Sequence, residues 1–541
     1  MQAGILAAAG IISRIIGLLY RSPLDSIIGE AGLGYYQSAY SYYMIILLIS
    51  SYSIPGAISK VIAQKLGVKE YRNAHRIFLC ALGYVLVAGA AASLFLFLGA
   101  GLFVEEAAIP VLRVLAPTIF VYGILGVLRG YFQAHKSMVQ TSLSQILEQI
   151  ANASVSIGAA YLLVKMRMGT IEQPSDAEGI VKHGVYGAMG SAMGTGAGVL
   201  IALIFMSCMY LINRKIIHKR IAKDKHQEIE SYRSIIREIT GVVTPFILST
   251  AIFNLTDSVN TKIFKSFYPA VKNLDLVNVN SKWGIYSGKA LTISNIPIAF
   301  ATSMASAMLP SVAQLIAAGD QMQAKEKINI AVKTTMLISI PCAVGLFVLA
   351  RPVTKIFFPY TPDSSLDYAE GLLMTLALSV IFYALSTLNS SILQGIGKLN
   401  TPIINAAIAL AVQTLTAIFL LVFTDMDLFS IAFSNTLYSG IMCVLNQISV
   451  SRAIGYRQEI DRTFLRPTLA AAIMGAIARI IYEGLLIFTE SMVISALPAI
   501  LAAVVIYFLV LIKIGGLGEN ELLAVPKGAL IVRILRRFRL L

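Results

Sequence analysis

The stretch AGILAAAGIISRIIGLLY, residues 3–20, decides the class of this protein. It carries one charge, Arg14, and about 20 mainly apolar residues are the length that an α-helix needs to cross a bilayer. Apolar runs of similar length recur along the chain, so the sequence predicts an all-α integral membrane protein. The composition agrees, because 13% of the residues are charged, against about 25% in soluble proteins.

The apolar runs predict fourteen transmembrane helices. They lie at residues 3–20, 35–59, 77–100, 107–128, 139–164, 184–212, 240–264, 283–309, 329–349, 367–393, 402–423, 427–450, 467–487 and 492–512. Lys and Arg are roughly three times as frequent in the connectors on the N-terminal side as in the others, which predicts cytoplasmic N- and C-termini. This asymmetry accounts for the net charge of +15 without a nucleic-acid partner.

Two pairs of segments repeat along the chain. They are SIPGAISKVIAQKLGVKEYRNAHRIF (53–78) with ASAMLPSVAQLIAAGDQMQAKEKINI (305–330), and RGYFQAHKSM (129–138) with LQGIGKLNTP (393–402). Gln64 of the first pair corresponds to Gln314, and Gln133 of the second pair corresponds to Gln394. Repeats of one orientation predict two pseudo-symmetric lobes of six helices each, with a substrate path near the midplane.

The repeat also sets the predicted domain boundaries. Residues 1–225 form the N-terminal six-helix lobe, and residues 226–455 form the C-terminal six-helix lobe. Residues 456–541 hold helices 13 and 14 and a basic tail, in which apolar and basic residues alternate from Lys527 to Arg539. Such a tail is typical of an amphipathic helix on an anionic membrane surface.

Four cations lie at least six residues from either end of an apolar run: Arg14, Arg113, Lys289 and Arg479. Each costs about 2.5–3.5 kcal/mol at a helix centre, so such residues usually face a protein interior or a watery cavity. Arg113 is shallow enough to be an interface anchor, and Arg479 has Glu483 four residues on as a partner. Arg14 and Lys289 are therefore candidates for a cavity that attracts an anion.

Two carboxylates also lie at least six residues from either end of an apolar run. Glu148 and Asp257 are candidates for a charge partner of Arg14 or for a site that binds a coupling cation. No phosphate-binding GxxxxGK[ST] motif, hydrolytic triad or metal-ligand spacing occurs, so we expect a transporter with no catalytic residue, no metal and no cofactor. The four cysteines fall in apolar runs and fit small buried hydrophobic residues.

Several segments resemble the multidrug/oligosaccharidyl-lipid/polysaccharide exporter superfamily. They are AAGIISRIIGLLYR (8–21), LDSIIGEAGLGYYQSAYS (24–41), IPGAISKVIAQ (54–64), VLRGYFQAHKSM (127–138) and SLSQILEQI (142–150). Within the superfamily the chain is most similar to the MurJ-like lipid II flippases and the stage V sporulation protein B group. The resemblance implies a V-shaped pair of lobes with alternating access, and a groove for a polyprenyl tail along helices 13 and 14.

The same resemblance implies a set of substrate-binding residues. The arginines of the family's first helix match Arg14 and, with one extra residue of spacing, Arg21. The arginine expected in the inner half of the second helix is absent, and Lys60 is the nearest cation. Together with Lys289, these side chains would attract a polyprenyl-linked diphosphate saccharide into the cavity.

The expected function is therefore a flippase in the bacterial plasma membrane, which moves lipid II or a related lipid-linked saccharide outward for cell-wall synthesis. The membrane potential favours outward movement of an anion by about 2.3 kcal/mol per charge per 100 mV, and Na⁺ or H⁺ coupling is a further option. Cell-wall synthesis proteins are possible partners. A cation-coupled multidrug exporter and a non-transporting membrane scaffold are the alternatives.

Overall fold

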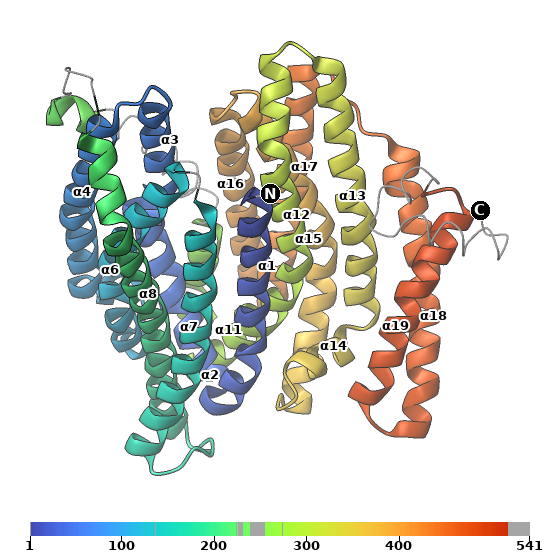
Figure 1. Ribbon diagram of the computed structural model, residues 1–541. Helices are drawn as coiled ribbons and strands as arrows, with labels where there is room; N and C mark the ends of the chain where they lie inside the picture. The colour runs from blue at the N-terminus through green and yellow to red at the C-terminus, as the bar shows by residue number, and fades with distance from the viewer. Residues whose placement is uncertain are drawn as a thin grey trace. The chain divides into compact units, whose positions relative to one another are not determined.

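The computed structural model describes residues 2–52, 54–135, 137–222, 224, 231–237, 255–272 and 274–517. Every regular element within these ranges is a helix (Figure 1), which confirms the all-α part of the predicted fold class. The chain divides into two compact units, Met1–Gly288 and Lys289–Leu541. The predicted amphipathic tail helix, residues 527–539, lies outside the described residues.

The first unit holds the helices up to the start of the π-helix η4. Its elements are α1 (Gln2–Leu19), α2 (Arg21–Leu47), η1 (Leu48–Tyr52), α3 (Ile54–Gly67), α4 (Tyr71–Leu98), α5 (Ala100–Phe103), η2 (Glu106–Ala108), α6 (Ile109–Ala134), α7 (Met138–Met168), α8 (Ala177–Ala222), helical residues 255–262, η3 (Ile263–Phe267), α10 (Tyr268–Lys272), α11 (Leu276–Trp283) and η4 (Gly284–Ala290). The division between the units falls inside η4, after Gly288.

The second unit continues from Lys289. Its elements are α12 (Leu291–Ala317), α13 (Gln321–Val348), α14 (Ala350–Phe357), α15 (Asp363–Gly395), α16 (Asn400–Phe423), α17 (Leu428–Ile454), η5 (Asp461–Leu465), α18 (Arg466–Thr489) and α19 (Met492–Lys513). The predicted lobe boundaries at residues 225 and 455 were derived from the sequence repeat, whereas the two compact units are defined by contacts. The predicted boundaries therefore stay a prediction.

Ten helical segments of the described chain are long and apolar enough to cross a membrane. They are Tyr71–Leu98, Glu106–Ala134, Met138–Met168, Ala177–Ile217, Gln321–Val348, Asp363–Gly395, Asn400–Phe423, Leu428–Ile454, Asp461–Thr489 and Met492–Lys513. Each coincides with one of the fourteen predicted spans. The other four, residues 3–20, 35–59, 240–264 and 283–309, stay predictions, and residues 240–254 lie outside the described residues.

The second predicted span shows why some apolar runs are harder to interpret. Its helix, α2, begins at Arg21 and continues through a kink at Gly29, where φ is +68°. Glycine adopts this backbone conformation without the steric cost that a Cβ atom would bring. After Leu47 the chain passes through a π-helical turn, η1, before α3 begins at Ile54. One predicted helix is therefore three consecutive elements.

The internal repeat reappears in the turns between helices. The amide of Glu70 donates to the carbonyl of Lys65 at 3.0 Å, and in the second copy of the repeat the amide of Asp320 donates to Leu315 at 3.0 Å. The helices that follow, α4 and α13, each have 28 residues. The turns therefore keep the register that Gln64 and Gln314 predict.

The second repeated pair keeps its own register. The amide of Ser137 donates to the carbonyl of Phe132 at 3.0 Å, and at the equivalent position of the second copy the amide of Lys398 donates to Leu393 at 2.9 Å. This register is the one that aligns Gln133 with Gln394. The α6–α7 and α15–α16 corners are therefore local structural equivalents.

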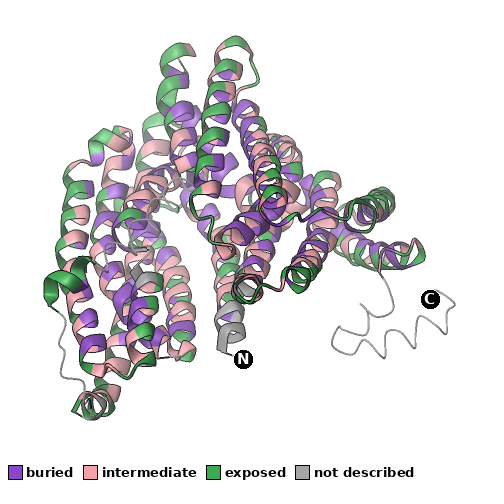
Figure 2. Ribbon diagram, turned by 90° about the horizontal axis from the view of Figure 1, so that it is seen from above, coloured by how far each residue is buried: buried purple, intermediate pink, exposed green. Residues whose placement is uncertain are grey.

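Each unit has its own apolar core. In the first unit, α4 packs on α6, and the ring centroids of Phe78 and Tyr131 lie 4.5 Å apart. In the second unit, buried side chains of α12, α13, α15, α18 and α19 form one cluster that includes Met336 and Leu388. In Figure 2 the buried residues lie on the sides of the helices that face their neighbours, and exposed residues line the outward sides. Large apolar side chains remain on the surface of the candidate spans, such as Leu162 of α7, which is 56% exposed. A long helix that is apolar on its outer side as well is typical of a membrane span.

Candidate functional site

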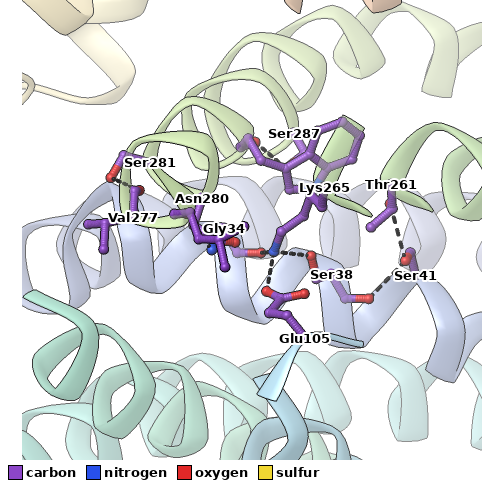
Figure 3. A network of polar contacts seen from close by, with 12 residues as sticks. Gly34, Ser38, Ser41, Glu105, Thr261, Lys265, Val277, Asn280, Ser281 and Ser287 are labelled. Carbon is purple, nitrogen blue, oxygen red and sulfur yellow. Dashed lines mark hydrogen bonds and ion pairs between the residues drawn. The ribbon is translucent and has the colours of Figure 1, made fainter. Parts of the chain in front are cut away.

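A buried lysine is the centre of a polar network in the first unit. Lys265, in η3, is 5% exposed. Its Nζ atom forms an ion pair with Glu105, donates to Ser38 Oγ at 2.5 Å and lies 3.5 Å from the carbonyl oxygen of Gly34 (Figure 3). The ammonium also lies 5.5 Å from the ring centroid of Tyr35. A buried ammonium needs such partners, because an unpaired charge in an apolar interior is strongly destabilising.

The network joins three separate parts of the chain. Gly34 and Ser38 lie on α2, Glu105 directly precedes η2, and Lys265 belongs to the segment that follows residue 255. Two further hydrogen bonds hold that segment to α2. Gln37 Nε2 donates to the carbonyl of Ser287 at 3.0 Å, and Ser258 Oγ donates to that of Ser41 at 3.1 Å. Residues 255–272 and 274–288 are therefore anchored along α2 by polar contacts.

Two glycines make this close approach possible. A Cβ atom added to Gly34 on α2 would lie 2.1 Å from the carbonyl oxygen of Asn280 on α11. A Cβ atom added to Gly284 would lie 2.0 Å from the carbonyl oxygen of Glu30. Both obstructing atoms belong to the backbone, so no side chain can turn away to make room. The two segments cross at this distance because each presents a residue without a side chain.

A second buried ion pair joins α6 to α7. Arg129 is 5% exposed, and its Nη2 atom lies 2.7 Å from Glu148 Oε2. Its Nε atom donates to Ser144 Oγ at 2.9 Å. The side chain of Glu148 is 16% exposed, so the carboxylate is partly accessible. The sequence singled out Glu148 as a possible charge partner, and the side chain that meets it here is Arg129.

Lys289 is the first residue of the second unit and is 1% exposed. Its Nζ atom donates to Thr361 Oγ1 at 3.0 Å and lies 5.9 Å from the ring centroid of Phe358. Of the four candidate cations of the predicted cavity (Arg14, Arg21, Lys60 and Lys289), Lys289 is the most buried. Its proposed contact with substrate stays a prediction.

The other candidates lie in the first unit. Arg14 on α1 and Lys60 on α3 are exposed, and Arg21, at the start of α2, is half-buried. Asp257 is exposed within helical residues 255–262, and its carbonyl accepts a 2.6 Å hydrogen bond from Thr261. The substrate-binding role of Arg14, Arg21 and Lys60 stays a prediction, and so does the coupling role of Asp257.

Two of the buried cations escaped the sequence interpretation. The predicted helices ended at residues 128 and 264, one residue before Arg129 and Lys265, so both were assigned to connectors. The acidic partners could have indicated that these cations are buried, because Glu105 and Glu148 each lie in or beside an apolar run. By contrast, the predicted pair of Arg479 and Glu483 is present, with 2.6 Å between Nε and Oε1.

The described residues can provide cationic and carboxylate groups within apolar surroundings, which is suited to moving a charged solute. Over the described ranges, no group of three or more His, Cys, Asp and Glu side chains is placed to hold a metal ion.

Comparisons with known proteins agree on one group. The sequence profile of the family described as lipid II flippase MurJ matches residues 75–503. Lipid II flippase MurJ of Bacillus subtilis (strain 168) is 23% identical over 496 residues, which are 88% of this chain and 87% of that protein. Stage V sporulation protein B of the same organism is 22% identical over 538 residues, with 98% of each chain covered.

Solved structures agree on the fold. A lipid II flippase MurJ in an inward closed conformation matches with a TM-score of 0.65 at 18% identity, covering 93% of this chain and 97% of that one. An inward-facing multidrug resistance transporter of the MATE family, from the MOP superfamily, matches with a TM-score of 0.61 at 15% identity, covering 84% and 98%. At these identities the likeness concerns the membrane fold.

Proposed function

The chain belongs to the lipid II flippase MurJ family, and from that premise we propose that it moves a polyprenyl-(di)phosphate-linked saccharide, namely lipid II, from the inner to the outer leaflet by alternating access. As a member of this family it is a multi-pass membrane transporter and not an enzyme. The observation that carries the proposal is the match to lipid II flippases along most of the chain, from residue 75 to residue 503.

The physical support comes from cations in apolar segments. Arg14, Arg21, Lys60 and Lys289 would attract the diphosphate and the acidic headgroup. Electrostatic attraction is stronger in a low-dielectric setting than in water, so even a single well-placed guanidinium has a measurable effect. Glu148 and Asp257 would act as charge partners or as coupling groups for Na⁺ or H⁺.

The proposal includes the finer architecture. Fourteen helices would form two six-helix lobes plus helices 13 and 14, with both termini cytoplasmic in a bacterial plasma membrane. The exposed apolar faces of α18 and α19, with Phe488 85% exposed and Leu501 70% exposed, would accommodate the polyprenyl tail. The inside-negative potential would drive the anionic headgroup outward, and cell-wall synthesis proteins would use the flipped lipid.

A cation-coupled multidrug exporter is the second candidate. The observation that favours it is the fold likeness to the MATE transporter, together with the exposed carboxylate of Asp257. An exporter of organic cations requires accessible carboxylates, whereas a carrier of a diphosphate lipid requires accessible cations. The two candidates therefore predict opposite residues to be essential.

Exchange of single charges separates the two candidates. We expect Arg14→Ala to reduce complementation of a strain depleted of its lipid II flippase by roughly tenfold or more, because a hydrogen bond to a charged group contributes about 1.5–3 kcal/mol. Asp257→Asn should complement more fully than Arg14→Ala. The measurement is growth and cell-wall precursor flipping in the depleted strain, at matched expression of each variant.

Arg113→Ala is the matched control, because Arg113 is an exposed cation of an apolar helix that packs on Phe97, with 5.7 Å from its guanidinium carbon to the ring centroid. It should behave as the wild type. Full activity of Arg14→Ala, combined with drug resistance that is lost only in Asp257→Asn, would favour the exporter instead.

A further inference from the structure

The helix corners α6–α7 and α15–α16 share one pattern of burial. In the register that aligns Gln133 with Gln394, buried positions of α6 recur as buried positions of α15. The pairs Val111 and Leu372, Leu115 and Leu376, and Thr118 and Ser379 illustrate this. The turns that follow keep the same register. The two corners are therefore equivalent residue by residue, and their chemistry can be compared position by position.

The equivalent corners differ in charge. In the shared register, Arg129 corresponds to Ser390, Ser144 to Asn405, and Glu148 to Ala409. The first unit thus places an ion pair where the second unit has only neutral groups.

The neutral corner is nevertheless well bonded. In the second unit, Asn405 Nδ2 donates to Asn446 Oδ1 at 2.9 Å, and Asn446 Nδ2 donates to Ser390 Oγ at 2.9 Å. Ser390 and Asn405 are each 8% exposed, and Ala409 is fully buried. The corner therefore packs without any charged side chain at these positions.

The ion pair at the α6–α7 corner has a desolvation cost, and the fold does not require charged residues there. Removing two charges from water is expensive, and replacing a buried ion pair with well-packed neutral residues is often neutral or stabilising. Because the equivalent corner folds with neutral residues, the fold alone does not explain why Arg129 and Glu148 are charged. A functional role for the pair does explain it.

The contacts of the pair indicate which ion could operate it. The guanidinium lies 2.7 Å from the Glu148 carboxylate, a position in which its positive charge would repel a bound metal cation. A proton is different, because it binds covalently to a carboxylate oxygen and neutralises it. The 16% exposure of the Glu148 side chain leaves a route for water and protons.

We propose that Glu148 binds one proton in the transport cycle and that this protonation releases Arg129 to bind an anionic phosphate group of the substrate. The inference rests on the proposed transport function and deepens it. The proton adds to a carboxylate oxygen, the ion pair opens, and Arg129 keeps its charge, because a guanidinium does not lose its proton in proteins. When the proton leaves, the carboxylate re-forms the pair and the phosphate is displaced.

The helices α1, α2 and α8 pack against α7, which carries Glu148. On α2, Tyr43 lies within electrostatic range of Glu148. On α1, Arg14 lies one turn from Gly17, whose Cβ position is 3.6 Å from Gln149 Oε1. On α8, Gly198 approaches the Glu148 carbonyl and brings no charge.

The chemistry of these groups indicates which of them can bind the proton. A guanidinium group such as that of Arg129 or Arg14 does not lose its proton in proteins. Glu148 is the one carboxylate among these named groups, and a carboxylate oxygen can accept a proton.

The test is the pH dependence of flipping in vesicles that contain the full-length chain and a fluorescent lipid-linked saccharide. Two variants remove the switch: Glu148→Gln, and the double variant Arg129→Ser with Glu148→Ala, which introduces the residues of the second unit at these two positions. Glu483→Gln is the matched control, because Glu483 also pairs with an arginine, Arg479, at 2.6 Å, but on an exposed face of α18.

We expect the wild type and Glu483→Gln to change flipping rate at least tenfold across a pH series. Both switch variants should lose that dependence. The double variant should keep the thermal stability of the wild type, whereas Glu148→Gln should unfold at a lower temperature, because it leaves the buried Arg129 without its carboxylate. A wild-type pH profile in either switch variant would overturn the inference, and so would unfolding of both, since the pair would then be structural. Flipping by the wild type without pH dependence would refute the switch alone, whereas no flipping by the wild type would refute the proposed function.

Discussion

Replacing Lys265 with methionine is expected to lower the free energy of unfolding by about 3–5 kcal/mol, the usual cost of removing one partner from a buried ion pair. Methionine keeps much of the length of the lysine side chain but removes the ammonium. The carboxylate of Glu105 and the hydroxyl of Ser38 then lose the cation that both contact. The carbonyl of Gly34 loses its nearby charge as well.

Thermal unfolding of the purified protein in detergent measures this effect. The double variant Lys265→Met with Glu105→Gln should recover much of the lost stability, because no carboxylate is then left without its cation. Lys262→Met is the control, since Lys262 is exposed and precedes Lys265 in the same helical segment. Equal stability of Lys265→Met and Lys262→Met would show that the network around Lys265 contributes nothing.

Gly284→Val should be at least as damaging, because it places a branched side chain where two backbones meet. The first added carbon would lie 2.0 Å from the carbonyl oxygen of Glu30 and 3.0 Å from the amide nitrogen of Gly34. Overpacking typically costs about 1–3 kcal/mol, and here the obstructing atoms are backbone, so we expect a value at or above the top of that range. Gly34→Val should behave in the same way, because its Cβ would lie 2.1 Å from Asn280.

Gly83→Val and Gly83→Ala provide the comparison for helix position and side-chain size. Gly83 is an exposed glycine within α4, and a Cβ atom there would meet nothing within 4 Å. Gly83→Ala should be neutral or stabilising, because alanine favours a helix over glycine by about 1 kcal/mol. The readout is the yield and thermal stability of folded protein. A Gly284→Val variant as stable as Gly83→Val would contradict the close crossing.

The long uniform helices were predictable from the sequence. Helix α4, for example, has one apolar run between a basic turn and Gly99, and its counterpart α13 also has an apolar run after a basic beginning, although its C-cap residue is Leu349. The broken elements were not predictable. The kink at Gly29 and the π-helical turn η4 depend on packing against other segments, and apolar periodicity carries no signal for either.

The candidate site was predictable in part for a related reason. Lys289 was recognised because apolar residues flank it on both sides. Lys265 and Arg129 were missed because they lie near the ends of apolar runs, where a charge is normally taken for a surface residue. Their burial comes from partners distant in sequence, Glu105 for Lys265 and Glu148 for Arg129. The repeat adds a second signal for Arg129. It aligns this residue with a serine, so the charge occurs at only one of the two equivalent helix corners.

Reconstitution of the purified chain into vesicles that contain lipid II tests the central claim most directly. The measured quantity is the fraction of lipid headgroups that become accessible to a membrane-impermeant reagent after the outer leaflet has been depleted. The account predicts protein-dependent translocation that is faster under an imposed potential of the favourable sign and slower in Arg14→Ala. Translocation no faster than in protein-free vesicles, under any potential or pH, would contradict it.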